Sequence, residues 1–271
     1  MELQPYLERI GFDREPRANL GTLRAILRAH VCSVPFENLD VQLGRPVTTA
    51  VEHAYDKIVM ARRGGWCYEQ NGLFGWVLSE IGFEVTRVAA AVMRAERGEV
   101  AAANHLALLV RTVDTEGEWL ADVGFGGSLL EPIRLEPGEY RYPPYRLGLR
   151  HLDDGYWRFW EDRGNGEFGY DFLAEPASED ALARQCKLLQ SDPQSNFVLN
   201  LIAQIRAPGH HTSLRGRVLS VRDARGEHSK TLDSCTELLT TLRDTFGLDV
   251  PEIGDCWPEI VRRHQQLFPG R

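Results

Sequence analysis

The spacing of apolar residues along the chain changes from a helical period to a strand period. Two apolar stripes at helical spacing occupy residues 23–31 and 51–59, and residues 49–52 have the sequence of a capping box in front of the second stripe. Over residues 84–175, short alternating segments separated by turn signals are typical of strands. The pattern predicts a helical first third followed by an antiparallel sheet or small barrel.

The last third of the chain mixes both periods. A helix is predicted over residues 178–190, and further helices are predicted over 234–246 and 258–268. Strands are predicted around 199–206 and 213–221. Helices, then strands, then a mixed segment indicate the α+β fold class.

Another helical run follows Cys67, because apolar residues recur at helical spacing from there until Gly82. Gly64 and Gly65 directly precede Cys67 and free the backbone for a sharp entry into the helix. Cys67 is therefore expected at a helix N-terminus, where unpaired amides and the helix dipole favour a thiolate over a thiol. The alternative is that Cys67 is a small apolar residue at a turn.

A histidine and an aspartate follow at positions that suit this cysteine. His105 opens an apolar run of strand length, and Asp122 ends a second run that follows a turn at residues 115–117. If the two runs pair as a hairpin, His105 and Asp122 lie near each other across the sheet. The imidazole would take the thiol proton and the carboxylate would fix the ring, which predicts a Cys67, His105 and Asp122 triad. The alternative for Asp122 is a cap on the glycine turn after it.

Composition narrows the function class. The chain has 271 residues, 43% of them hydrophobic, which suits one enzyme with two or three subdomains. Its net charge of −8 argues against a nucleic-acid surface, and no apolar run approaches the ~20 residues of a membrane span. The N-terminus lacks the form of a signal peptide, and five scattered cysteines indicate neither a metal site nor a disulfide framework. We expect a cytoplasmic enzyme without a metal.

Three motifs resemble the arylamine N-acetyltransferases in order and spacing: Arg-Gly-Gly-Trp-Cys at 63–67, Asn-His at 104–105, and Ala-Asp-Val-Gly-Phe-Gly at 121–126. The segments 6–12 and 34–40 resemble the opening signatures of that family. Residues 195–197 resemble the segment that lines the acceptor cleft in relatives. The resemblance covers the chain from its first helix to about residue 200.

The resemblance implies roles for individual residues. Cys67 would accept the acyl group, His105 would be its base and Asp122 would orient the histidine. The residues implied to brace the site are Arg9, Glu37 and Arg63. The residues expected to line the acceptor pocket are Phe36, Phe125 and Phe197.

The sequence offers one candidate contact to coenzyme A (CoA), the glycines that follow Asp122. A backbone nest that binds the phosphates of CoA would account for Gly124, Gly126 and Gly127, but tight-turn geometry alone would account for them too. Some relatives have Thr-Gly before the histidine and use it near the cofactor. This chain has Ala-Ala-Ala-Asn at 101–104, so that contact does not carry over.

The family layout implies three parts around a cysteine-protease-like core. An N-terminal helical bundle carrying the cysteine is expected over 1–85, and a central antiparallel β-barrel carrying the histidine and aspartate over 86–190. A C-terminal α/β lid is expected over 191–271.

The implied activity is acetyl transfer from acetyl-CoA to the nitrogen of small aromatic amines or hydrazines, by a ping-pong route through a cysteine thioester. Three alternatives stay open. A transglutaminase-like thiol hydrolase would use the same triad with another acyl donor. An amide synthase of natural-product biosynthesis would take a carrier-bound acyl group. A module that only binds CoA or an aromatic ligand would have no need of a complete triad.

Overall fold

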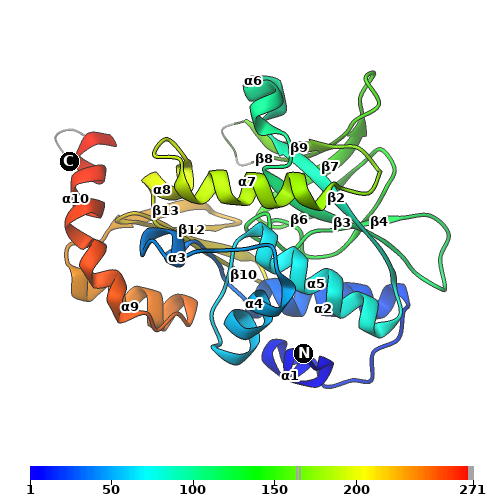
Figure 1. Ribbon diagram of the computed structural model, residues 1–271, viewed down its shortest axis with the longest axis horizontal. Coiled ribbons are helices and arrows are strands. Elements are labelled where there is room, and N and C mark those ends of the chain that lie inside the picture. Colours follow the sequence, from blue (N-terminus) through cyan, green and yellow to red (C-terminus); the bar gives the residue numbers. More distant parts are fainter. Residues whose placement is uncertain (163, 165, 268–271) are drawn as a thin grey trace.

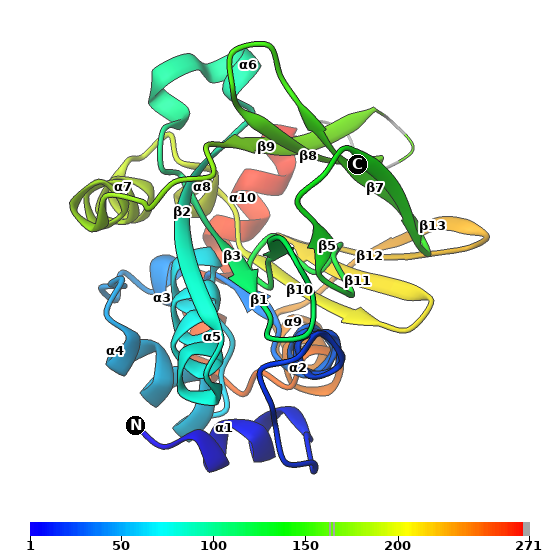
Figure 2. The same cartoon turned by 90° about the vertical axis from the view of Figure 1, so that its right-hand side faces the viewer.

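The structure is a computed structural model, and it describes residues 1–162, 164 and 166–267. Two antiparallel sheets pack with helices, so the predicted α+β class is confirmed (Figure 1). In the turned view, strands β7 (Tyr145–His151), β8 (Trp157–Asp162) and β9 (Glu167–Phe172) lie on one side of the molecule (Figure 2). Helices α1 (Leu3–Ile10), α2 (Leu20–Ser33) and α5 (Cys67–Ile81) lie on the other side, and the sheet that contains the strands of residues 202–231 lies between them.

The first third of the chain is helical apart from one short strand. Its elements are α1 (Leu3–Ile10), α2 (Leu20–Ser33), β1 (Phe36–Glu37), α3 (Leu39–Gln42), α4 (Val51–Tyr55), the π-helical turn η1 (Asp56–Met60) and α5 (Cys67–Ile81). The capping box predicted at residues 49–52 is wrong. Helix α4 has Ala50 as its N-cap residue, with no side-chain cap, and the Ala50 amide donates to the hydroxyl of Thr48 at 3.2 Å.

The middle of the chain forms an eight-stranded antiparallel sheet in the order β5-β4-β3-β2-β9-β8-β7-β6. Its strands are β2 (Glu84–Val92), β3 (His105–Arg111), β4 (Trp119–Ala121), β5 (Ile133–Arg134), β6 (Gly138–Tyr142), β7 (Tyr145–His151), β8 (Trp157–Asp162) and β9 (Glu167–Phe172). A short helix α6 (Arg94–Arg97) and the turn η2 (Gly98–Ala101) connect β2 to β3. Strand β3, the half of the predicted hairpin that begins with His105, is buried from His105 to Val110 and is therefore an interior strand.

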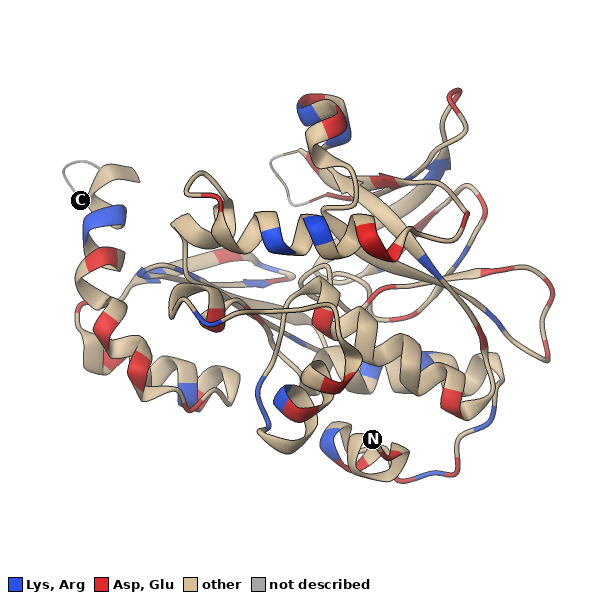
Figure 3. Cartoon of the chain, viewed as in Figure 1, with Lys and Arg blue, Asp and Glu red and all other residues tan. Residues whose placement is uncertain are grey.

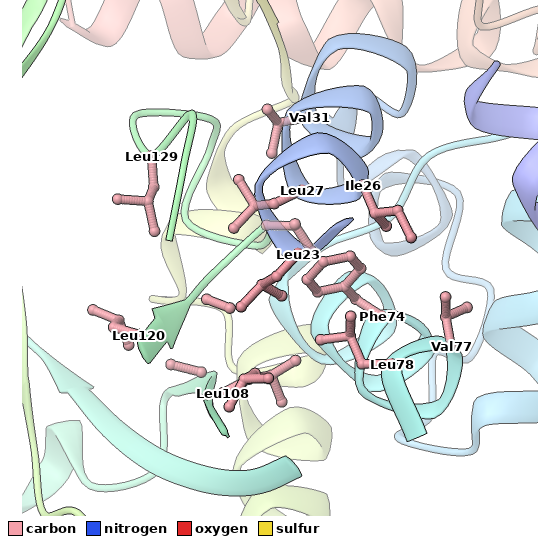
Figure 4. Close-up of a cluster of buried hydrophobic side chains, with 14 of the residues drawn as sticks. Leu23, Ile26, Leu27, Val31, Phe74, Val77, Leu78, Leu108, Leu120 and Leu129 are labelled. Carbon is pink, nitrogen blue, oxygen red and sulfur yellow. The ribbon is translucent and has the colours of Figure 1, made fainter. Parts of the chain in front are cut away.

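The main core lies between α2, α5 and this sheet. The side chains labelled in Figure 4 are Leu23, Ile26, Leu27, Val31, Phe74, Val77, Leu78, Leu108, Leu120 and Leu129. Each buried leucine or phenylalanine contributes about 1.5–3 kcal/mol to stability. Helix α5 packs directly on β3, since a Cβ on Gly75 would lie in van der Waals contact with Leu108, at 3.4 Å. The core therefore fixes the N-terminus of α5 relative to β3.

The last part of the chain contains four strands where two were predicted. The second sheet has the order β1-β10-β11-β12-β13. Its later strands are β10 (Ile202–Ala207), β11 (His210–Arg215), β12 (Val218–Asp223) and β13 (Gly226–Thr231). Gly216, at φ +57°, turns the chain inside the predicted strand 213–221, and the strand predicted around 199–206 begins later, at Ile202, because Leu199 still belongs to a helical turn.

The helices of this part are α7 (Glu179–Ser191), α8 (Asn196–Leu199), the 3-10 turn η3 (Pro251–Cys256), α9 (Cys235–Phe246) and α10 (Trp257–Leu267). Residue 268, the last of the predicted helix 258–268, lies outside the described residues. The predicted boundaries after residues 85 and 190 fall inside β2 and the last turn of α7, and the three-part division stays a prediction. In the described part of the chain, no helix has the length and apolar character to cross a membrane.

Candidate active site

Cys67 is the first residue of α5 and is 3% exposed. Neither of the two glycines before it has room for a side chain: Gly64 lies against the segment that enters β1, and Gly65 lies against Glu69 of α5. A Cβ on Gly64 would lie 2.0 Å from the carbonyl oxygen of Pro35. The Gly65 amide donates to that same oxygen at 3.3 Å, and the Glu37 amide donates to the Gly65 carbonyl at 3.1 Å. The segment that leads into the helix is thus held against β1, which fixes the position of the thiol.

His105 and Asp122 are neighbours, as the hairpin predicts. His105 is the first residue of β3, and Asp122 directly follows β4, which pairs with β3 in antiparallel register. The Nε2 atom of His105 lies 2.8 Å from Oδ2 of Asp122. Both side chains are buried, so their interaction is shielded from water.

The carboxylate of Asp122 accepts four hydrogen bonds. Oδ2 accepts from His105 and from the Tyr170 hydroxyl, and Oδ1 accepts from Asn71 Nδ2 and from the Gly124 amide, each at 2.8 Å. Burial alone raises the pKa of Asp122, but the charge of His105 and these donors together lower it below the ordinary value. Asp122 is therefore an anion at neutral pH in spite of its burial.

His105 is held between this anion and the thiol. Burial lowers the pKa of His105, but the charge of Asp122 and hydrogen bonds to Asp122 and Cys67 raise it to about 10. Because Nε2 faces Asp122, Nδ1 is left for the hydrogen bond to Cys67. At neutral pH the ring is thus a cation next to the cysteine, an arrangement suited to stabilising a thiolate.

Sequence reasoning missed Asn71 and Tyr170. Asn71 lies one helical turn after Cys67, and besides Asp122 it donates to the Leu106 carbonyl at 2.6 Å and accepts from the Val123 amide at 3.0 Å. A polar residue four positions after the cysteine in a helix was the available signal. Tyr170 arrives from β9 through strand pairing with β2, and nothing in the sequence near the triad indicates it.

The glycines after Asp122 serve close packing. A Cβ on Gly124 would lie 2.7 Å from the Cα of Cys67, and one on Gly126 would lie 2.1 Å from Oε1 of Gln204. The Gly124 amide already donates to Asp122, so it is not free to bind a phosphate. Phosphate binding by Gly126 and Gly127 stays a prediction.

A cavity of about 1120 Å³ opens in front of the cysteine and histidine. The three phenylalanines expected in the acceptor pocket, Phe36, Phe125 and Phe197, all lie on its wall. The rings of Phe125 and His105 meet edge to face at 5.3 Å, and those of Phe36 and Phe197 lie 6.2 Å apart. The cavity is larger than a site of about 300–1,000 Å³ for one drug-sized ligand.

Glu37 and Arg63 belong to a buried charge cluster behind the cysteine. Arg63 pairs with Glu37 at 2.8 Å and with Asp40 at 3.3 Å. Lys57, which the sequence did not single out, bridges Asp40 at 2.8 Å and Glu69 at 2.9 Å. Glu69 also accepts from the backbone amide of Trp66 at 3.2 Å. The cluster therefore ties β1 and η1 to the first turn of α5.

Arg9 supports the same segment through the backbone. Its guanidinium donates to the carbonyls of Ile58 at 3.0 Å, Ser33 at 2.9 Å and Arg63 at 3.3 Å. These carbonyls lie at the end of α2, in η1 and just before Gly64, so Arg9 joins three chain segments that adjoin the cysteine.

Within the described ranges, no group of three or more His, Cys, Asp and Glu side chains is arranged to hold a metal ion.

Comparison with known proteins places this geometry in a family. The family model described as N-acetyltransferase matches residues 19–254. The arylamine N-acetyltransferase of Mycolicibacterium smegmatis is 42% identical over 93% of this chain and 94% of its own length. That of Escherichia coli (strain K12) is 32% identical over 92% of this chain and 90% of its own length.

Solved structures agree with the sequences. The M. smegmatis arylamine N-acetyltransferase superposes with a TM-score of 0.86 at 38% identity, covering 97% of this chain and 98% of that one. The Mycobacterium marinum arylamine N-acetyltransferase, solved in complex with CoA, gives 0.87 at 30% identity, covering 98% and 99%. The chain therefore belongs to the arylamine N-acetyltransferase family.

Proposed function

We propose that the protein transfers an acetyl group from acetyl-CoA to the nitrogen of an arylamine, through a thioester on Cys67. The observation that carries this proposal is the buried row of Cys67, His105 and Asp122, of which Cys67 and His105 line a large cavity with aromatic walls. The names of the M. smegmatis and E. coli relatives and the CoA complex of the M. marinum enzyme support the choice of substrates.

In the first half-reaction, the sulfur of Cys67 attacks the acetyl carbonyl carbon of acetyl-CoA. A new carbon–sulfur bond forms, and the bond from the acetyl carbon to the CoA sulfur breaks. The protonated ring of His105 gives its proton to the leaving CoA sulfur, which departs as a thiol. Asp122 keeps the ring oriented through Nε2 in both protonation states.

In the second half-reaction, the amine nitrogen attacks the acetyl-cysteine carbonyl. The neutral ring of His105 takes a proton from the nitrogen, and Cys67 leaves as a thiolate beside the histidine cation. The flat ring of the acceptor suits the phenylalanine walls at positions 36, 125 and 197. An arylhydrazine offers the same kind of nucleophilic nitrogen on the same kind of ring, so we include hydrazines among the acceptors.

We assign a supporting role to Arg9, Glu37 and Arg63: they hold the segment before Cys67, and none of them lines the cavity.

The location that we propose is the cytoplasm. All five cysteines are free, which suits a reducing compartment.

The test is a panel of acyl donors crossed with acceptors, read by the acetylated product and by release of free thiol. We expect acetyl-CoA to release thiol at a rate that depends on an added arylamine or arylhydrazine. Equal release without any amine would instead indicate a thiol hydrolase. Acceptance of carrier-bound acyl groups but not of acetyl-CoA would instead indicate an amide synthase. Binding of CoA without turnover would leave only a binding module.

A further inference from the structure

Three guanidinium groups that line the cavity form no short ion pair with a carboxylate among the described residues. Arg97, Arg215 and Arg263 line the cavity, and in the described part of the chain none of them forms an ion pair with a carboxylate. A fourth, Arg222, is paired with Glu227 and so is already neutralised. In a chain with a net charge of −8, arginines that line one cavity without a short ion pair need an explanation.

Two of the three, Arg215 and Arg263, lie close enough to repel each other. Burial, and then the charge of Arg263, lower the pKa of Arg215. Among the described residues, Arg215 donates to the amide oxygen of Asn196 at 3.1 Å and Arg263 donates to Gln266 at 3.3 Å. The Nε atom of Arg263 is buried and has no partner among the described residues. Two like charges held together with spare donors form a site for an anion.

Glu259, an acidic side chain near Arg263, is held by a different arginine: the hydrogen bond from Arg262, and then the charges of Arg262 and Arg263, lower the pKa of Glu259. Glu259 lies one helical turn before Arg263 on α10 and lines the same cavity. It is held by Arg262, whose Nε donates to Oε2 of Glu259 at 2.8 Å. Figure 3 shows basic residues on α10 and on neighbouring strands of the second sheet.

The cavity that these arginines line also reaches Cys67 and His105. An acetyl donor that fills it must place a thioester at the cysteine and can present negative charge at the arginines. Acetyl-CoA has this shape, with its phosphate groups at the end remote from the thioester. Guanidinium groups bind phosphate oxygens through paired, charge-assisted hydrogen bonds.

We infer that Arg215 and Arg263 bind phosphate groups of acetyl-CoA while its thioester reaches Cys67. This inference rests on the proposed function and adds to it the two residues that select a nucleotide-bearing donor. Arg97, on the short helix α6, also lines the cavity but is not part of the pair.

The test compares donors with and without phosphate groups. Arg215→Gln and Arg263→Gln are each expected to raise the KM for acetyl-CoA about tenfold with kcat little changed. The rate of Cys67 acetylation by p-nitrophenyl acetate, which has no phosphate, is expected to stay within twofold of the parent. Free CoA should bind the double variant more weakly and with a smaller salt dependence. Arg243→Gln, on α9 and away from the cavity, is the matched control.

Several outcomes would overturn the inference. Unchanged KM values for acetyl-CoA in both variants would remove the arginine pair from donor binding, and a loss seen only in Arg97→Gln would move the phosphates to α6. Slower acetylation by p-nitrophenyl acetate would show that the substitutions disturb the triad instead. If the parent protein is acetylated by p-nitrophenyl acetate but neither binds CoA nor reacts with acetyl-CoA, the proposed function itself fails.

Discussion

Asp122 keeps its negative charge inside the protein because four donors surround its two oxygens. His105 supplies only one of them, and Asn71, Tyr170 and the Gly124 amide supply the rest. An unpaired buried carboxylate would be protonated instead. The carboxylate therefore remains charged, and the histidine gains a partner that raises its pKa.

The raised pKa of His105 predicts how its ring titrates. Folding raises this pKa from the ordinary 6.5 to about 10, because the attraction of Asp122 outweighs burial. The ring proton therefore stabilises the folded state fully below about pH 6.5, and this contribution is lost as the pH rises toward 10. NMR of the ring carbons should show His105 protonated from pH 6 to 9. In the same spectra His30, whose pKa burial lowers to about 3, should stay neutral.

Removing the charge of Asp122 tests the cause of that shift. In Asp122→Asn the burial of His105 is no longer opposed by a negative charge, so its pKa should fall below 6.5 and acetylation of Cys67 should slow by orders of magnitude. A midpoint near 6.5 in the parent protein, or an unchanged midpoint in a folded Asp122→Asn variant, would contradict the assignment.

A strained turn just before His105 gives a second prediction. Ala103 has φ +57°, a conformation that costs a non-glycine residue about 1–2 kcal/mol, and its carbonyl accepts from the Tyr68 hydroxyl at 2.7 Å. Tyr68→Phe should therefore loosen the turn and slow Cys67 acetylation roughly tenfold, since a lost buried hydrogen bond costs about 1 kcal/mol or more. Adding Ala103→Gly should restore most of the rate, because glycine adopts this conformation freely.

The control for this pair is Tyr55→Phe, which removes a hydroxyl that donates to the Glu2 carbonyl at 3.0 Å, far from the triad. It should leave acetylation unchanged. If Tyr68→Phe behaves like Tyr55→Phe, or if glycine at position 103 gives no recovery, Tyr68 does not position the turn.

The sequence predicts the individual residues that have reactive side chains, and it misses residues whose role depends on contacts between distant segments or on backbone conformation. Cys67, His105 and Asp122 are found from a helix start and a hairpin, and the structure brings them together. Tyr170 could not be found, because its contact to Asp122 depends on β9 pairing with β2 nearly eighty residues earlier in the chain. Ala103 has no signal at all, since alanine is not a residue that usually marks a left-handed turn.

At the scale of elements, two helix starts provide an internal comparison. Cys67 begins α5 and Cys235 begins α9, so both thiols lie at a helix N-terminus. Cys235 has its sulfur directed to the Gly254 carbonyl at 3.7 Å, whereas Cys67 has the histidine cation beside it and a cavity in front of it. The histidine, rather than the helix alone, should therefore decide which thiol reacts.

Alkylation with iodoacetamide at pH 6 tests this comparison. Peptide mapping should find Cys67 modified at least about ten times faster than Cys235 in the parent protein. In His105→Gln the difference should largely disappear, because only the helix N-terminus then remains. Labelling led by Cys235 in the parent, or an undiminished preference for Cys67 in His105→Gln, would show that the histidine is not what activates the thiol.

Elements were predicted well where they bury an apolar face and poorly where they do not. Helix α5 buries Leu73, Phe74, Val77 and Leu78, and its predicted start and end match the structure. Strand β13 is exposed along its whole length and carries polar residues, so no alternation marks it. The capping box at 49–52 failed because the chain enters α4 one residue later than that motif requires, and a local motif cannot foresee that path.

On the scale of the whole molecule, the first and last parts of the chain are joined through Asn38. Its side chain donates to the carbonyls of Phe197 at 2.7 Å and Asn200 at 2.8 Å, and accepts from the Ile202 amide at 2.8 Å. Strand β1, just before it, pairs with β10, and the buried Leu39 belongs to the core of the C-terminal part. The predicted lid is thus built on residues from the N-terminal part.

Asn38→Ala should therefore destabilise the protein strongly. The substitution leaves the Asn200 carbonyl and the Ile202 amide without their side-chain partner, while the Phe197 carbonyl still accepts from Gln42, and the free energy of unfolding should fall by about 3 kcal/mol. Asn19→Ala, which removes the side-chain cap of α2, should cost only about 1 kcal/mol. Denaturant unfolding measures both. A loss for Asn38→Ala no larger than that for Asn19→Ala would mean that the two parts are held together by other contacts.

Cys67 should carry the acetyl group covalently from acetyl-CoA to the amine, and the mass of the intact protein shows whether it does. Incubation with acetyl-CoA alone should add one acetyl group, mapped to Cys67, and release one equivalent of CoA in a burst. Adding an arylamine should return the protein to its original mass with formation of the acetylated amine, and Cys67→Ala should show no burst. Amine acetylation that proceeds while no acetyl-protein ever forms, or an acetyl group on another residue, would contradict the account.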